Sequence, residues 1–281
     1  MQAAYLFGVK DLRFVETNPA LMGADDVRVE VAQTGICGTD IHIYQGMALG
    51  PASSEPRPFG HEFSGRVAEI GGAVRGFRVG DRVTAVPSTP CGTCSLCRSG
   101  RASVCQNRVG LRGGSWAASI VVPAQNLFHL PDEVSDALGA ATEPMACAVR
   151  AVERAGIVPG DRVCVVGAGP IGLFVTAVAK ASGASRVIVS EPKAYRRELA
   201  KRVGADDVID PASTDPAEAV RDLTDGLGAE VVIEAVGMPR TIEQAATFAA
   251  PGATILVIGV PDAASRVSFP GQDFYAKEIT I

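Results

Sequence analysis

The 281-residue sequence lacks any block of basic residues: its formal net charge is −5, and both signs are mixed along the whole chain. This balance argues against nucleic acid or an anionic membrane surface as the main partner. No uninterrupted apolar stretch reaches the roughly 18 residues needed to span a bilayer. The opening residues, MQAAYLFGVKDLRFVE, lack the basic region, apolar run and small-residue cleavage site of a signal peptide. We therefore expect a soluble protein of the cytoplasm.

The composition is that of a protein that can fold stably without disulfide bonds. Apolar residues make up 47% of the sequence and charged residues 20%, which is enough to build a sizeable core. The length suits one large domain or two ordinary ones. Clustered cysteines in a reducing compartment are more often metal ligands than disulfides.

The sequence pattern changes near residue 150. Before it, short alternating runs such as DVRVEVAQTG and EFSGRVAEIG are separated by Gly, Pro and polar turns, a pattern typical of an antiparallel, barrel-like β domain. From about residue 160, strands rich in Val and Ile alternate with helical runs, ending in KEITI. This second pattern predicts an α/β domain, with a parallel sheet covered on both faces. We predict two domains, 1–150 and 151–281.

A glycine-rich turn follows the first strand of the second domain. RVCVV runs into Gly167-Ala168-Gly169-Pro170-Ile171-Gly172, which has the spacing G-x-G-x-x-G. The pattern alone is weak, but here it has the required strand–turn–helix context. Gly167 would permit the tight turn, Gly169 a close approach to a pyrophosphate, and Gly172 close packing of helix on strand. We predict a Rossmann-type dinucleotide site.

The second strand of this domain ends in Glu191. An acid at that position accepts hydrogen bonds from an adenosine ribose and repels a 2′-phosphate, which favours NAD over NADP. Arg196 and Arg197 favour NADP instead, because guanidinium groups so close to Glu191 can hold a phosphate. The structural alternative is that both arginines are solvated helix positions.

Four of the seven cysteines fall within PCGTCSLCRSGRASVC. Cys91, Cys94, Cys97 and Cys105 have the spacing C-x2-C-x2-C-x7-C, which suits the closed tetrahedral geometry of structural zinc. A bacterial iron–sulfur run needs a shorter last interval and a following proline, whereas residue 106 is Gln. A redox pair would leave two cysteines unexplained. A closed four-thiolate site cannot take a substrate, so this cluster is predicted to be structural.

A looser set of ligand types comprises Cys37, His61, Glu62 and Glu143. They are far apart in the sequence, and spacing alone does not make them a site. Taken singly, each is more often structural: a core thiol, a turn histidine or a helix-start carboxylate. Cys147 and Cys164 have no motif around them, and we expect both to be small buried groups.

Together these motifs resemble the zinc-dependent medium-chain alcohol dehydrogenases, over essentially the whole sequence. The matching elements, in the family's order, are C-G-T-D-x-H at 37–42, G-H-E at 60–62, the four cysteines, E-P at 143–144 and the glycine turn. The E-P element is similar to the sorbitol, butanediol and threonine dehydrogenase branch. The resemblance implies a GroES-like catalytic domain of the β-barrel type before the Rossmann domain, and a homodimer or homotetramer.

The resemblance also implies roles for individual residues. Cys37 and His61 would bind a catalytic zinc, with Asp40 orienting His61. Glu62 and Glu143 would share the carboxylate and outer-sphere places, and which of them binds the metal directly stays open.

An open zinc site lets an alcohol lose its proton and pass a hydride to the nicotinamide. Thr39 would take the proton and His42 would pass it towards solvent; otherwise they are a turn hydroxyl and a surface residue. The positions matching cofactor contacts are Gly167, Gly169, Pro170, Ile171, Gly172, Glu191, Arg196, Ile258, Gly259 and Val260.

Family members usually continue about sixty to seventy residues past a strand like KEITI. We therefore expect this sequence to be a fragment or a shortened form; a chain that ended here would have a more open cleft and weak activity or stability. Our leading hypothesis is an NAD- and zinc-dependent dehydrogenase of secondary alcohols or polyols, with one catalytic and one structural zinc. The alternatives are an NADP-dependent reductase and a non-catalytic cofactor-binding or redox-sensing protein.

Overall fold

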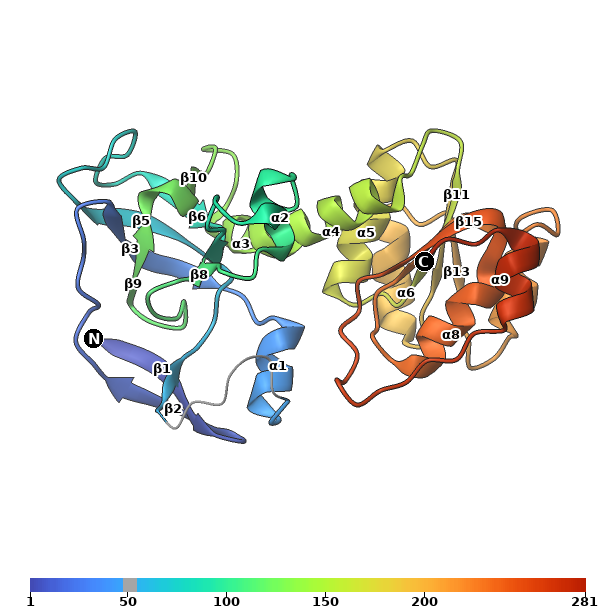
Figure 1. Cartoon of the computed structure of the whole chain (residues 1–281), viewed down its shortest axis with the longest axis horizontal. Helices are drawn as coiled ribbons and strands as arrows, with labels where there is room; N and C mark the ends of the chain where they lie inside the picture. Colours follow the sequence, from blue (N-terminus) through green and yellow to red (C-terminus); the bar gives the residue numbers. More distant parts are fainter. Residues whose placement is uncertain (48–54) are drawn as a thin grey trace. The chain divides into compact units, whose positions relative to one another are not determined.

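The computed structural model describes residues 1–47 and 55–281, which divide into two compact units, Met1–Glu143 and Pro144–Ile281. The boundary lies seven residues before the predicted one. Helix α4 (Thr142–Ala155) is the reason, because its residues Ala148, Ala151 and Val152 are buried in the core of the second unit. The first unit runs from blue to green in Figure 1 and the second from yellow-green to red.

The first unit is built on two antiparallel sheets, as the alternating pattern predicts. The larger has the order β10-β6-β5-β3-β9, and buried Val27, Val29, Phe63, Val67 and Val83 form its core. Its strands are β3 (Asp26–Thr34), β5 (Phe63–Ile70), β6 (Arg82–Ala85), β9 (Ser119–Pro123) and β10 (Leu127–His129). The smaller sheet has the order β2-β1-β4, with β1 (Gln2–Gly8), β2 (Asp11–Glu16) and β4 (Arg57–Pro58).

Helix α1 (Gly38–Tyr44) begins directly after Cys37. The side chain of Asp40 accepts a hydrogen bond of 3.0 Å from the backbone N–H of Cys37, so the acid satisfies a donor that the helix start leaves unpaired. Helix α3 (Asp136–Ala140) lies before the unit boundary, with Ser135 as its N-cap.

The cysteine segment forms a separate lobe. It contains α2 (Ser95–Arg98) and the 3₁₀ turn η1 (Ala102–Val104), and the two-residue strands β7 (Ser88–Thr89) and β8 (Val109–Gly110) pair at its base.

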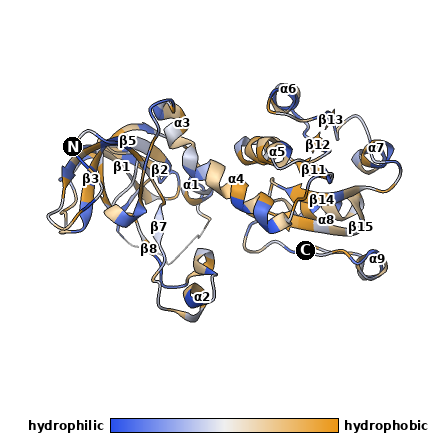
Figure 2. Cartoon of the chain, turned by 90° about the horizontal axis from the view of Figure 1, so that it is seen from above, coloured by the Kyte–Doolittle hydropathy of each residue, from blue (hydrophilic) through white to orange (hydrophobic). Residues whose placement is uncertain are grey.

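The second unit has the predicted parallel sheet, with the order β13-β12-β11-β14-β15. Alternate residues of β11 point to opposite faces: Val163 and Val165 pack with α4, α5 and α6, while Cys164 and Val166 pack with α7 and α8. Figure 2 shows helices on either side of a largely apolar sheet. The elements are β11 (Arg162–Val166), α5 (Pro170–Ala181), β12 (Arg186–Ser190), α6 (Ala194–Arg202), β13 (Asp207–Ile209), α7 (Pro216–Asp222), β14 (Ala229–Glu234), α8 (Pro239–Phe248) and β15 (Ala249–Val257).

Three details differ from expectation or add to it. After α9 (Gly271–Lys277), the predicted strand KEITI is represented by one parallel bridge, between Thr254 and Thr280. Cys164 is buried as expected, but Cys147 is exposed, because it lies at the edge of the buried stripe of α4 rather than within it. Among the residues described, no helix is both long enough and apolar enough to cross a membrane.

Candidate functional site

Cys37, His61 and Glu62 come together in the first unit. One ligand atom from each lies within 4.8 Å of the others, although Cys37 precedes α1 and the other two precede β5. Sulfur, nitrogen and oxygen donors in this number match the three protein ligands of an open zinc site. The structure thus juxtaposes three of the four residues in the looser predicted set.

The position of Glu62 depends on a glycine. A Cβ atom at Gly35 would lie 2.0 Å from Oε2 of Glu62, so the carboxylate occupies the space of the missing side chain. The backbone N–H of Gly35 donates to the carbonyl of Glu62 at 2.9 Å. Glu62 is only 6% exposed, and burial raises the pKa of its carboxyl.

Asp40 links the other two ligands. One of its oxygens lies 3.5 Å from Nδ1 of His61, and the other accepts the Cys37 N–H. The hydrogen bond with Asp40, followed by one with Cys37, raises the pKa of His61 to about 10. With Nδ1 held by the acid, Nε2 is the nitrogen left for a metal.

Glu143 lies outside the group of atoms within 4.8 Å of one another. Burial raises the pKa of its carboxyl, and its charge interacts with those of His61 and Asp40. It therefore belongs to the same electrostatic neighbourhood at the end of the first unit.

Thr39 and His42 lie three residues apart on α1, the spacing that places side chains on one helix face. Nδ1 of His42 is buried and has no hydrogen-bond partner among the described residues. A buried imidazole nitrogen without a partner is costly, and a group bound from outside would satisfy it.

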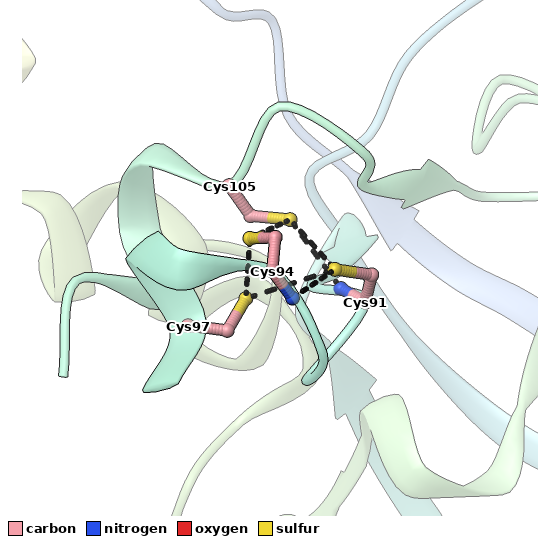
Figure 3. A group of neighbouring side chains, drawn as sticks. All are labelled: Cys91, Cys94, Cys97 and Cys105. Carbon is pink, nitrogen blue, oxygen red and sulfur yellow. Dashed lines mark hydrogen bonds between the residues drawn. The ribbon is translucent and has the colours of Figure 1, made fainter. Parts of the chain in front are cut away.

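The four sulfurs of the cysteine lobe form a compact cluster (Figure 3). The Sγ atoms lie 3.5 Å apart for Cys94 and Cys97, 3.6 Å for Cys91 and Cys105, 3.9 Å for Cys94 and Cys105, and 4.0 Å for Cys91 and Cys97. Sulfurs at the corners of a tetrahedron around zinc, at Zn–S of about 2.3 Å, lie about 3.8 Å apart. The geometry fits the closed site that the spacing predicts.

Backbone donors support charge on this cluster. Hydrogen bonds from Thr93 and Cys94 lower the pKa of Cys91 to about 6. Desolvation, followed by the bonds to Cys94 and Cys105, raises the pKa of Cys97 to about 12. A cation bound among these sulfurs would hold its ligands as thiolates.

Each glycine of the dinucleotide turn has the predicted environment. Gly167 has φ +95°, which favours glycine. A Cβ at Gly172 would lie 1.9 Å from the carbonyl of Gly167, whereas a Cβ at Gly169 would meet nothing within 4 Å. Gly172 is therefore needed for packing, and the surface at Gly169 is open for a ligand. Pro170 and Ile171 open α5, whose N-terminus favours phosphate.

Glu191 follows β12 and is 3% exposed. Its carboxylate accepts 2.9 Å hydrogen bonds from the backbone N–H groups of Ala168, in the glycine turn, and Lys193. Arg196 lies 3.8 Å from it. Arg197 instead donates to backbone carbonyls and pairs with Asp210, so it is engaged within the protein.

Ile258, Gly259 and Val260 follow β15. Glu234, which the sequence did not single out, fixes the first two of these residues: its backbone carbonyl accepts from the N–H groups of Ile258 and Gly259. Its fully buried carboxylate accepts from Val236, Gly237 and the Thr241 hydroxyl. The available signal was an acid ending a buried strand, AEVVIE, as Glu191 follows RVIVS.

Two family models match the chain. The alcohol dehydrogenase GroES-like domain matches residues 23–132, and the zinc-binding dehydrogenase model matches residues 170–281. Together they cover the candidate zinc ligands Cys37, His61 and Glu62, the cysteine lobe and the end of the glycine turn from Pro170 onward.

The chain is similar to named relatives. L-threonine 3-dehydrogenase of Pyrococcus horikoshii is 42% identical over 250 residues, which are 88% of this chain and 72% of the relative. Sorbitol dehydrogenase of Halalkalibacterium halodurans is 39% identical over 264 residues, 92% of this chain and 76% of the relative.

The fold matches solved structures. A Sinorhizobium meliloti protein with NADP bound superposes with a TM-score of 0.94 at 34% identity, over 99% of this chain and 82% of its own. The fold, both cysteine-containing clusters, the glycine turn and these similarities agree: the chain belongs to the zinc-dependent medium-chain alcohol dehydrogenase family.

Proposed function

We propose that the chain is an NAD-dependent dehydrogenase that oxidises a secondary alcohol, of a polyol, a vicinal diol or a threonine-like amino alcohol, to a ketone. The observation that carries the proposal is the convergence of Cys37, His61 and Glu62 on one point. Unlike the closed four-sulfur lobe, three ligands leave a coordination position for a substrate.

The residues of the first unit would have separate roles in metal binding and proton transfer. Cys37, His61 and Glu62 would hold a zinc ion, which supplies a Lewis acid that acidifies an alcohol hydroxyl. Asp40 holds His61 in the orientation and tautomer that a metal needs. Glu143 contributes an outer carboxylate. Thr39 would accept the alcohol proton, and His42, whose Nδ1 is buried and unpartnered among the described residues, would relay it towards solvent.

The second unit supplies the hydride acceptor site. The turn from Gly167 to Gly172 presents backbone N–H groups and the N-terminus of α5 to a pyrophosphate. Glu191 favours NAD, because a buried carboxylate fixed by two N–H groups repels a 2′-phosphate and can accept from a free ribose hydroxyl. Ile258, Gly259 and Val260 would line the nicotinamide side.

The substrate class is supported by the E-P element at 143–144 and by similarity to enzymes named for threonine and sorbitol, both of which carry secondary hydroxyls. NADP is the second candidate cofactor. The NADP bound in the similar Sinorhizobium meliloti structure and the half-buried guanidinium of Arg196, 3.8 Å from Glu191, favour it.

The test is reduction of NAD and of NADP, followed by absorbance, over a panel of polyols, vicinal diols and L-threonine, with and without added zinc. We expect turnover with NAD, none in the Cys37→Ser variant, and two zinc ions per wild-type chain. Faster turnover with NADP would overturn the cofactor assignment. Two zinc ions without turnover on any substrate would favour a cofactor-binding or redox-sensing protein.

We further expect a cytoplasmic protein that forms a homodimer or homotetramer. Fractionation of the source cells and sedimentation of the purified chain test these two expectations separately.

A further inference from the structure

Ser115 and Trp116 are not candidate ligands, yet they contact the backbone on both sides of the Cys37–His61–Glu62 cluster. Nε1 of Trp116 donates to the carbonyl of Gly35 at 2.9 Å, two residues before Cys37. The backbone N–H groups of Ser115 and Trp116 donate to the carbonyls of Gly60 and Phe59, each at 3.0 Å. The pair thus bonds to the segment before α1 and to the segment that carries His61.

Three donors meet at the carbonyl of Glu62. The hydroxyl of Thr34 donates at 2.8 Å, the N–H of Gly35 at 2.9 Å and the hydroxyl of Ser115 at 3.4 Å. The hydroxyls of Thr34 and Ser115 are also 2.8 Å apart. Since Ser115 is 0% exposed, water cannot replace its hydroxyl without a structural change.

The indole of Trp116 covers the peptide next to His61. Gly60 has φ +84°, and a Cβ atom there would lie 2.1 Å from Cδ1 of Trp116 and 2.7 Å from Oγ of Ser115. The ring also packs edge-on against Phe59, with centroids 5.1 Å apart. The position of His61 therefore depends partly on how the Trp116 indole packs against Gly60.

We propose that Ser115 and Trp116 are positioning residues of the metal site, fixing the separation of the Cys37 and His61–Glu62 segments, and that Trp116 reports whether that site is filled. The inference rests on the proposed function, since it needs a metal at these three ligands. It concerns metal affinity rather than turnover. Outer contacts of this kind typically change metal affinity by about 10- to 100-fold.

The fluorescence part follows from composition. Trp116 is the single tryptophan of the chain, so intrinsic indole emission comes from one ring, hydrogen-bonded to Gly35 and seated on Gly60. Filling the Cys37–His61–Glu62 site should change that emission. Filling the cysteine lobe, a separate cluster, should not.

The experiment counts zinc per 281-residue chain after dialysis against a graded series of a zinc chelator. Ser115→Ala and Trp116→Phe remove the hydroxyl and the indole N–H. Ser64→Ala is the matched control: Ser64 is also 0% exposed in the same unit, and its hydroxyl donates to the carbonyl of Asp136. We expect Ser115→Ala and Trp116→Phe to lose one zinc at a chelator concentration about tenfold lower than wild type and Ser64→Ala do.

The same samples test the reporter. Zinc added to chelator-stripped wild-type protein should shift the Trp116 emission, and Cys37→Ser should abolish the shift while the cysteine lobe still fills. A wild-type chain with only the lobe zinc would overturn the proposed function and this inference together. Two zinc ions held as firmly in Ser115→Ala and Trp116→Phe as in wild type would overturn the positioning role alone. An emission unchanged by filling the second site would overturn the reporter role.

Discussion

The carboxylate of Asp40 lies 3.5 Å from Nδ1 of His61 while accepting the backbone N–H of Cys37. One buried acid therefore orients a candidate imidazole ligand and fixes the start of the helix that follows a candidate thiolate ligand. The geometry needs the charge as well as the shape, because a carboxylate increases the basicity of the imidazole.

Replacing Asp40 with Asn should separate these two contributions. The amide oxygen can still accept the Cys37 N–H, but the negative charge beside His61 is lost. We expect the zinc of this site to be held about 10- to 100-fold less tightly, measured by chelator competition. The cysteine lobe serves as the internal control, since equal loss from both sites would indicate unfolding. Unchanged affinity would contradict the orienting role.

Glu191 should govern the choice between the two nicotinamide cofactors. Glu191→Gln keeps the side-chain length and removes the charge that repels a 2′-phosphate. We expect the ratio of kcat/KM for NAD to that for NADP to fall about tenfold. Glu198→Gln is the control: it removes a charge from an exposed side chain of α6, the helix that follows Glu191. This variant should leave the ratio unaltered. A ratio unaltered in Glu191→Gln would mean that discrimination lies elsewhere.

Glu234 should be important for stability as well as for cofactor binding. Glu234→Ala leaves the N–H groups of Val236 and Gly237 without their buried acceptor. We expect a loss of about 2–4 kcal/mol in the free energy of unfolding, from urea denaturation, and a raised KM for NAD. Glu218→Ala, at an exposed position of α7, should cost much less. Equal losses in the two variants would refute the argument.

Cys164 should not react with thiol reagents in the folded protein. Its side chain is 0% exposed, and burial raises the pKa of the thiol to about 12. The thiolate fraction at pH 8 is then about one in ten thousand, and it grows tenfold with each pH unit. Peptide mapping after mild alkylation should find Cys164 unmodified until denaturant is added. Modification of Cys164 in the folded protein would show that β11 opens readily.

The features that could be predicted from the sequence differ in the length of sequence that encodes them. The glycine turn and the cysteine lobe are encoded within sixteen residues or fewer. Spacing therefore identifies the lobe, and spacing together with the flanking strand and helix identifies the turn. The cluster of Cys37 with His61 and Glu62 depends on strand pairing across the first unit, and only the family resemblance pointed to it.

Other contributors were not predictable from local pattern. Ser115 and Trp116 bond to backbone segments that are far away in the sequence. The role of Glu234 becomes visible only in the fold, where the loops after β14 and β15 meet at this residue. The exposure of Cys147 depends on which face of α4 the core covers. Each of these is a consequence of long-range packing rather than of propensity.

The two cysteine-containing clusters differ in the softness of their donors. Four sulfurs favour thiophilic ions, whereas sulfur, imidazole and carboxylate together suit zinc and its harder neighbours. In a cell exposed to cadmium, the two sites would therefore exchange metal unequally, with the lobe retaining the toxic ion and the mixed site continuing to exchange.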